Sequence, residues 1–147
     1  MSLRLAARRA ATDGKERGVI LVDTSIWIEV FRAPPSIDLE ATASFDDVVT
    51  CLPVIQEVLQ GFRNERAFRT ARDAMLALPI VESPMTDALI LEATELYRSA
   101  RRAGVTVRSS VDCVIAACAI RNDLELLHRD RDYDHLQAIA PLAVRRA

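Results

Sequence analysis

Short runs of apolar residues alternate along this chain with longer segments in which apolar residues recur every three or four positions. Consecutive aliphatic residues, many of them β-branched, predict strands that are buried on both faces. These predicted strands cover residues 19–22, 48–51, 80–81 and 124–127, with 142–144 as a possible fifth. The segments between them have the periodicity of helices and cover 26–31, 37–44, 53–62, 65–78, 86–103, 111–120 and a short stretch that ends near 140. Strands that alternate with helices predict an α/β fold in which helices flank a central, mostly parallel sheet.

Proline and serine residues mark several ends of these elements. Pro34 should end the first helix, and Pro79 should end the helix that begins at residue 65. Pro53 stands where a helix can begin, because the first helical position needs no backbone N–H. Ser109 and Ser110 precede the apolar helix 111–120, and we expect them to cap its amino end.

Carboxylates occupy positions at which a buried chain normally places apolar residues. Asp23 ends the first strand, Glu57 interrupts the apolar face of its helix, and Asp112 lies in the first turn of an almost wholly apolar helix. A further acidic group follows the strand 124–127 and consists of Asp130, Asp132 and Asp134. Open parallel sheets bind ligands at the carboxyl ends of their strands, so these side chains are candidates for one site.

Gathering several carboxylates in one place is costly unless cations neutralise them. A set of oxygen ligands favours Mg²⁺ or Mn²⁺ over zinc, which prefers Cys and His. Such an ion activates water against a phosphodiester, so the pattern predicts metal-dependent phosphodiester hydrolysis. The alternative for each residue is structural: Asp23 and Asp112 as helix caps, Glu57 on the surface, and residues 130–134 as a solvated run of charge.

Composition limits the class of protein. With 147 residues, 50% of them hydrophobic, the chain has the size of one globular domain, which we place at residues 19–147. The apolar runs are far shorter than the ~20 residues that span a membrane. Three cysteines without metal-binding spacing suit a reducing cytoplasm, where we expect the protein to reside. A net charge of −2 gives no general electrostatic case for nucleic acid.

Residues 1–18 form a basic, Ala-rich leader that we place outside the fold. It carries Arg4, Arg8, Arg9, Lys15 and Arg17, and a helix up to about Thr12 is one interpretation. An expression remnant, an over-extended start site and a basic arm all remain open, and we assign the leader no function.

Four segments together resemble the PIN-domain family, above all the VapC toxins of bacterial VapBC toxin–antitoxin pairs. They are ILVDTSIW at 20–27, VIQEVLQG at 54–61, SVDCVIAA at 110–117 and LHRDRDY at 127–133. The resemblance implies a PIN-like fold and an endoribonuclease toxin that cleaves RNA, typically tRNA or ribosomal RNA. It also implies a homodimer and a cognate VapB-type antitoxin, whose C-terminal segment covers the active site.

The resemblance also implies roles for individual residues. Asp23, Glu57 and Asp112 would bind Mg²⁺ or Mn²⁺ with a fourth acid, for which Asp130 is the first choice and Asp132 the reserve. Thr24, Ser25 and Ser110 would be polar neighbours that orient ligands or water.

Surface arginines such as Arg101, Arg102 and Arg108 are candidates for steering RNA, although no RNA-binding residue is assigned. Trp27 could stack on a base or lie in the core or a dimer interface, and His128 could contact RNA or have a structural role.

Two other functions compete with this one. A non-catalytic PIN-like module that binds RNA or a partner is the main alternative, but such a module should have lost at least one acid. A phosphatase or response-regulator-like protein needs a lysine at a strand end. Lys15, the one lysine of the chain, precedes the first strand, which excludes that class.

Overall fold

Five parallel strands form one sheet in this computed structural model, which describes residues 18–147. The strands are β1 (Ile20–Val22), β2 (Val48–Cys51), β3 (Ile80–Val81), β4 (Glu125–His128) and β5 (Val144–Arg146). Their order in the sheet is β3-β2-β1-β4-β5, and every pairing is parallel. The predicted α/β class is therefore confirmed. The proposed leader lies outside the described residues, apart from Gly18.

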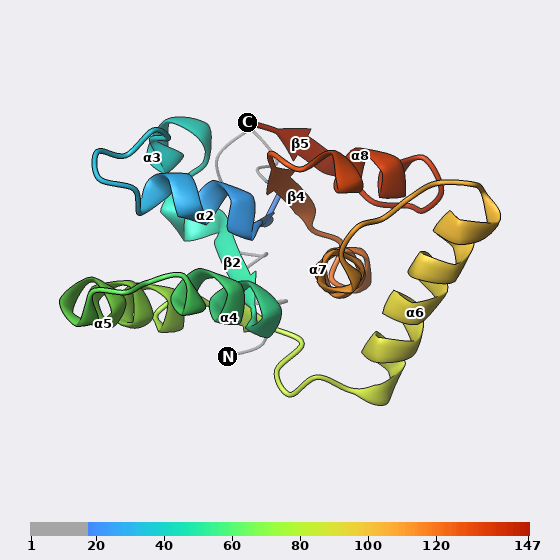
Figure 1. Cartoon of the computed structure of the whole chain (residues 1–147), viewed down its shortest axis with the longest axis horizontal. Coiled ribbons are helices and arrows are strands. Elements are labelled where there is room, and N and C mark those ends of the chain that lie inside the picture. The colour runs from blue at the N-terminus through green and yellow to red at the C-terminus, as the bar shows by residue number, and fades with distance from the viewer. Residues whose placement is uncertain (1–17) are drawn as a thin grey trace.

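Helices connect the strands. They are α2 (Thr24–Val30), α3 (Leu39–Thr42), α4 (Leu52–Gln60), α5 (Glu65–Leu76), α6 (Asp87–Arg102), α7 (Ser110–Arg121) and α8 (Arg131–Gln137), with a 3₁₀ turn η2 at Phe45–Asp47. Figure 1 shows α2, α4 and α5 together on one side of the view and α6, α7 and α8 on the other. Within the described residues, no helix has the length and apolar character needed to cross a membrane.

The core is centred on β1, β4 and α7. Leu21, Val22, Leu126 and Leu127 are completely buried, as expected for inner strands that are covered on both faces. Most residues of helix α7 are buried, and apart from Ile115 and Asp112 these buried residues are alanines and cysteines. Helix α6 packs along α7. Small side chains on α7 allow neighbouring elements to approach closely.

Several element boundaries differ from the sequence predictions. Helix α2 ends at Val30 with Phe31 as its cap residue, so the helix stops before it reaches Pro34. Ser109 stands at the N-cap of α7, but its side chain makes no capping hydrogen bond, so that part of the prediction is wrong. Strand β5 begins at Val144, two residues later than expected.

The order of the strands determines where a site can form. The chain builds β1, β2 and β3 toward one edge and then returns to place β4 on the other side of β1. Crevices form at such switch points, beyond the carboxyl ends of the strands. Here Val22 pairs with Leu127, and the backbone N–H of Asp23 donates to the Leu127 carbonyl at 2.9 Å. Residues that follow β1 and β4 therefore meet at one edge of the sheet.

Candidate metal centre

Three carboxylates meet at this edge of the sheet. Asp112, Asp130 and Asp132 each offer an oxygen, and these oxygens all lie within 4.8 Å of one another. Asp112 comes from the first turn of α7, Asp130 is the N-cap residue of α8, and Asp132 lies in the first turn of α8. Carboxylates at these positions benefit from the partial positive charge of a helix amino end. This acidic cluster is the candidate metal centre.

Local hydrogen bonds fix the turn between β4 and α8. Asp130 Oδ1 accepts a hydrogen bond from the backbone N–H of Asp132 at 2.9 Å, which caps the helix. The backbone N–H of Asp130 donates to Nδ1 of the buried His128 at 3.1 Å. Burial lowers the pKa of His128, so the neutral ring that can accept this bond is favoured. His128 therefore has the structural role that was one of its two predicted interpretations.

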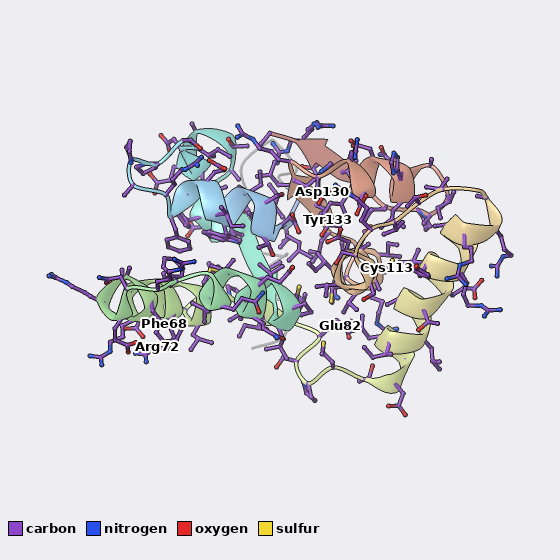
Figure 2. All side chains as sticks on the ribbon, viewed as in Figure 1. Phe68, Arg72, Glu82, Cys113, Asp130 and Tyr133 are labelled. Atoms are coloured by element: carbon purple, nitrogen blue, oxygen red, sulfur yellow. The ribbon has the colours of Figure 1, made fainter. Side chains whose placement is uncertain are left out.

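The hydroxyl of Tyr133 connects Asp23 with Asp112 of the acidic cluster. Its side chain is fully buried, and its hydroxyl donates to Asp23 Oδ1 at 2.6 Å. The hydroxyl oxygen of Tyr133 also lies 3.3 Å from Asp112 Oδ1. Burial and the charges of Asp23 and Asp112 raise the pKa of Tyr133 well above its usual value, so the phenol keeps its proton. Figure 2 labels Tyr133 beside Asp130, between α8 and α7.

Two hydroxyl residues hold the remaining acids. Ser25 donates to Asp23 Oδ2 through both its backbone N–H, at 3.0 Å, and its Oγ, at 2.6 Å. Thr24 Oγ1 donates to Glu57 Oε1 at 3.0 Å, which connects α2 with α4. Glu57 is half-buried rather than on the surface, and burial followed by the nearby Asp23 charge raises its pKa despite the Thr24 bond.

Arg108 pairs with two acids of the cluster. Its Nη2 lies 2.9 Å from Asp130 Oδ1, and its Nε lies 3.3 Å from Asp132 Oδ1. Its backbone N–H also donates to Asp132 Oδ2 at 3.1 Å. Among residues 18–147, Arg108 is the cation that forms ion pairs with these acids, so one guanidinium faces several carboxylates.

Burial and the neighbouring carboxylates change the protonation of Asp112. Burial, together with the smaller effects of Asp132 and Asp23, raises its pKa to about 8. A buried carboxyl group keeps its proton near neutral pH when the surrounding positive charge does not offset its burial and its acidic neighbours. The set of oxygen donors and this deficit both fit a divalent cation, which would replace the proton.

Not every predicted site residue joins the centre. Thr24 and Ser25 touch Glu57 and Asp23, as predicted for polar neighbours. Ser110 is exposed and lines a pocket with Tyr97 between α6 and α7, so its supporting role remains a prediction of the family resemblance. Asp134 is not part of the cluster: its Oδ2 pairs with Arg146 at 2.8 Å, and its Oδ1 lies 3.4 Å from His128 Nε2.

The aromatic and arginine candidates for RNA binding are placed differently from one another. Trp27 is buried and stacks on Phe31, so the idea that it stacks on a base is wrong. Arg101 lies over the ring of Tyr97, and Arg102 pairs with Glu95, both on α6. The candidate arginine at the acidic cluster is Arg108.

Sequence reasoning gave no role to the hydroxyl of Tyr133. The only signal was its place three residues after Asp130, in a motif read for its acids. A phenylalanine would fill the same space, so the connection to Asp23 depends on an oxygen whose partner lies 110 residues away.

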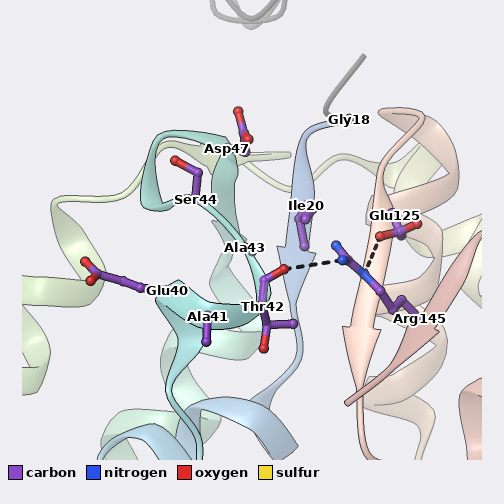
Figure 3. A pocket seen from close by; sticks show the side chains of 10 residues that line it. All are labelled: Gly18, Ile20, Glu40, Ala41, Thr42, Ala43, Ser44, Asp47, Glu125 and Arg145. Carbon is purple, nitrogen blue, oxygen red and sulfur yellow. Dashed lines mark hydrogen bonds and ion pairs between the residues drawn. The ribbon is translucent and has the colours of Figure 1, made fainter. Parts of the chain in front are cut away.

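A pocket larger than the one beside Ser110 lies at the other edge of the sheet. It has a volume of about 580 Å³ and is lined by residues at the amino ends of β1 and β4, including Ile20 and Glu125. In Figure 3, Arg145 crosses this pocket, where its Nε lies 2.7 Å from Glu125 and its Nη1 donates to the Thr42 carbonyl at 3.3 Å. The acids of the candidate metal centre follow the opposite ends of the strands, so this pocket is a separate feature.

Comparison with known proteins agrees with the fold. The chain matches the PIN domain over residues 20–139, and it therefore belongs to the PIN-domain family. Within that family it is similar to ribonuclease VapC11 of Mycobacterium tuberculosis. The two are 38% identical over 130 residues, which cover 84% of this chain and 96% of that protein.

Solved structures show the same architecture. A VapBC2 structure from Rickettsia felis, bound to a DNA fragment from its promoter, matches with a TM-score of 0.69 and 17% identity, covering 87% of this chain and 98% of that one. VapC20 of Mycobacterium tuberculosis, described as a sarcin–ricin loop cleaving toxin, matches with a TM-score of 0.64 and 20% identity, covering 84% and 98%. At these identities the likeness concerns the fold.

Proposed function

We propose that this chain is a metal-dependent endoribonuclease of the VapC type, a toxin that hydrolyses RNA phosphodiester bonds. The observation that carries the proposal is the approach of Asp112, Asp130 and Asp132 to within 4.8 Å at the carboxyl edge of the sheet. Clusters of carboxylates attract hard divalent cations. The 38% identity to proteins named as VapC ribonucleases supports the reaction class.

The ion that we assign is Mg²⁺ or Mn²⁺, since the donors are carboxylates without Cys or His. Its candidate ligands are Asp23, Glu57, Asp112 and Asp130, with Asp132 as the reserve. When bound, such an ion activates a water molecule and stabilises the leaving oxygen of a phosphodiester.

The chain's own residues prepare these ligands. Tyr133 and Ser25 hold the two oxygens of Asp23, so the carboxylate has a fixed orientation. Thr24 holds one oxygen of Glu57 and leaves the other for a ligand. Asp112 must release its proton before it binds a cation, which makes this residue sensitive to pH.

The relatives support a class of substrate and a partner for this proposal. A structural neighbour is described as a toxin that cleaves the sarcin–ricin loop, which supports ribosomal RNA as one target class, with tRNA as the other. Other neighbours are VapBC complexes, which support a cognate VapB-type antitoxin. We further propose a homodimer that acts in the cytoplasm.

Cleavage of RNA tests the reaction. Purified protein is incubated with tRNA and total RNA in Mg²⁺, in Mn²⁺ and in EDTA, alongside the variants Asp112→Asn and Asp73→Asn. The second variant is a matched control, because Asp73 is an exposed acid on α5 that pairs with Arg72. We expect discrete fragments from the wild type and the control with metal, and none with EDTA or from Asp112→Asn.

The main alternative is a non-catalytic module that binds RNA or a partner. It predicts intact RNA under every metal condition, with a mass of the purified sample that shows no bound antitoxin. Cleavage that survives in Asp112→Asn would overturn the assignment of the acidic cluster.

A further inference from the structure

Two carboxylates hold the guanidinium of Arg108, and both belong to the acidic cluster. Arg108 precedes α7, and its side chain donates hydrogen bonds to Asp130 and Asp132 at the start of α8. The exposed fraction of the side chains rises along the contact, from 2% at Asp132 through 29% at Asp130 to 54% at Arg108. The guanidinium therefore lies at the solvent-exposed edge of the acidic cluster, where the more buried Asp132 and Asp130 hold it.

Only part of this guanidinium is used by the protein. Nε and Nη2 donate to the two acids, whereas Nη1 makes no hydrogen bond within residues 18–147. A guanidinium carries five N–H donors in a rigid fork, and a fork with free donors suits the oxygens of a phosphate. An arginine held by two carboxylates also loses little side-chain freedom when it binds a ligand.

The two acids use their oxygens differently. Both oxygens of Asp132 accept hydrogen bonds from Arg108, one from the backbone and one from the side chain. Asp130 accepts its bonds through Oδ1, and within the described residues Oδ2 accepts none. Asp132 therefore fits the task of holding Arg108, and Asp130 retains an oxygen for a cation.

We propose that Arg108 is the phosphate-binding residue of this site. Asp132 and Asp130 position it, and its outward N–H groups bind a non-bridging oxygen of the RNA backbone beside the acidic cluster. The inference rests on the proposed ribonuclease function for its choice of ligand. It adds a named contact for the substrate and gives Asp132 a positioning role rather than the role of metal ligand.

The positive charge of Arg108 has a second consequence. A guanidinium this close to the carboxylates repels a divalent cation that shares them. Removing the charge should therefore strengthen metal binding while it weakens RNA binding. A purely structural brace would give a different result, because its loss would weaken both.

The test compares wild type, Arg108→Gln, Arg108→Lys and the control Arg69→Gln. Arg69 is an exposed arginine on α5 that pairs with Glu65, so its substitution removes one charge at a distance from the site. Binding of a labelled single-stranded RNA of mixed sequence is measured in EDTA at several salt concentrations, and Mn²⁺ affinity is measured by calorimetry. Circular dichroism confirms that each variant folds.

The expected result has two parts. The salt dependence of RNA binding, plotted as log K against log salt, should lose about 0.7 of its slope in Arg108→Gln, the value for one phosphate contact on a single strand, and stay unchanged in Arg69→Gln. Mn²⁺ should bind Arg108→Gln several-fold more tightly than wild type. Arg108→Lys should keep the slope and the wild-type Mn²⁺ affinity, since it keeps the charge.

An unchanged slope in Arg108→Gln, or a wild type that binds no RNA in EDTA, would overturn the assignment. Weaker Mn²⁺ binding in Arg108→Gln would assign Arg108 a bracing role instead. RNA binding needs no catalysis in this experiment. A smaller salt slope in Arg108→Gln, found together with no metal-dependent cleavage by the wild type, would therefore overturn the ribonuclease function. It would still support the contact between Arg108 and RNA.

Discussion

The hydroxyl of the fully buried Tyr133 lies 2.6 Å from Asp23 Oδ1 and 3.3 Å from Asp112 Oδ1. One neutral donor thus stands between two acids that the chain separates by 89 positions, from residue 23 to residue 112. The bond from Tyr133 therefore fixes the position of Asp23 Oδ1 relative to Asp112.

Removing this hydroxyl should destabilise the metal-free protein. Tyr133→Phe keeps the ring but leaves the buried Asp23 Oδ1 without its donor, at a cost of about 1–3 kcal/mol in the free energy of unfolding. Urea denaturation in EDTA measures the change. Tyr97→Phe on α6 is the control, since Tyr97 is only half-buried and contacts Arg101 through its ring. Equal losses in the two variants would contradict a special role for the Tyr133 hydroxyl.

The pKa of Asp112 predicts how metal binding depends on pH. Its value of about 8 in the folded protein lies above the ordinary 3.8. Between these values the folded state holds a proton that the unfolded chain has released, so the metal-free protein loses stability as pH rises through this window. A cation must displace the same proton, so Mn²⁺ affinity should rise with pH and level off above about 8.

Calorimetric titrations with Mn²⁺ at several pH values measure this effect, and the heats in different buffers report the released proton. The variant Asp112→Asn has no proton to release at this position. Its residual Mn²⁺ affinity should vary less with pH than that of the wild type. The same pH dependence in both proteins would assign the titration to another group.

Thr24 provides a test of the Glu57 position. Thr24→Val removes the donor to Glu57 Oε1 but keeps the shape of the buried side chain. We expect metal-dependent cleavage to fall about tenfold, because a carboxylate that loses its orienting bond samples unproductive positions. Thr24→Ser keeps a hydroxyl and should retain most of the activity. Equal activity of the Val and Ser variants would show that this bond does not position Glu57 for the reaction.

The core should respond to truncation in the ordinary way. Leu127→Ala removes a completely buried side chain from β4 and should cost about 2–5 kcal/mol in the free energy of unfolding. Leu91→Ala removes a side chain that is 68% exposed on α6 and should change it by less than about 0.5 kcal/mol. Chemical denaturation of the two variants compares these changes directly.

Local sequence signals predicted most of the fold. The aliphatic run before Asp23 and the apolar positions around Pro53 indicated β1 and α4, and both elements form. Buried parallel strands need continuous apolar residues, so their sequences are easy to recognise. The ends of α2 and β5 were less certain because tertiary contacts decide where a terminal turn or edge pairing stops.

The candidate site was predicted as a set of acids but not as an arrangement. Acids placed after strands and inside apolar faces are visible in the sequence, which is how Asp23, Glu57 and Asp112 were found. The bonds of Tyr133 and Arg108 join segments that are far apart in the chain, and no local pattern encodes such contacts. The exposed position of Ser110 is likewise a result of how α6 and α7 pack.

Locating a bound ion tests the central claim most directly. Crystals of the protein grown with Mn²⁺ would show the ion by its anomalous scattering. We predict a peak about 2.1 Å from carboxylate oxygens that include those of Asp112 and Asp130, and a much weaker peak for Asp112→Asn. An ion in the pocket lined by Glu125 and Asp47, or no ion at a saturating Mn²⁺ concentration, would contradict the account.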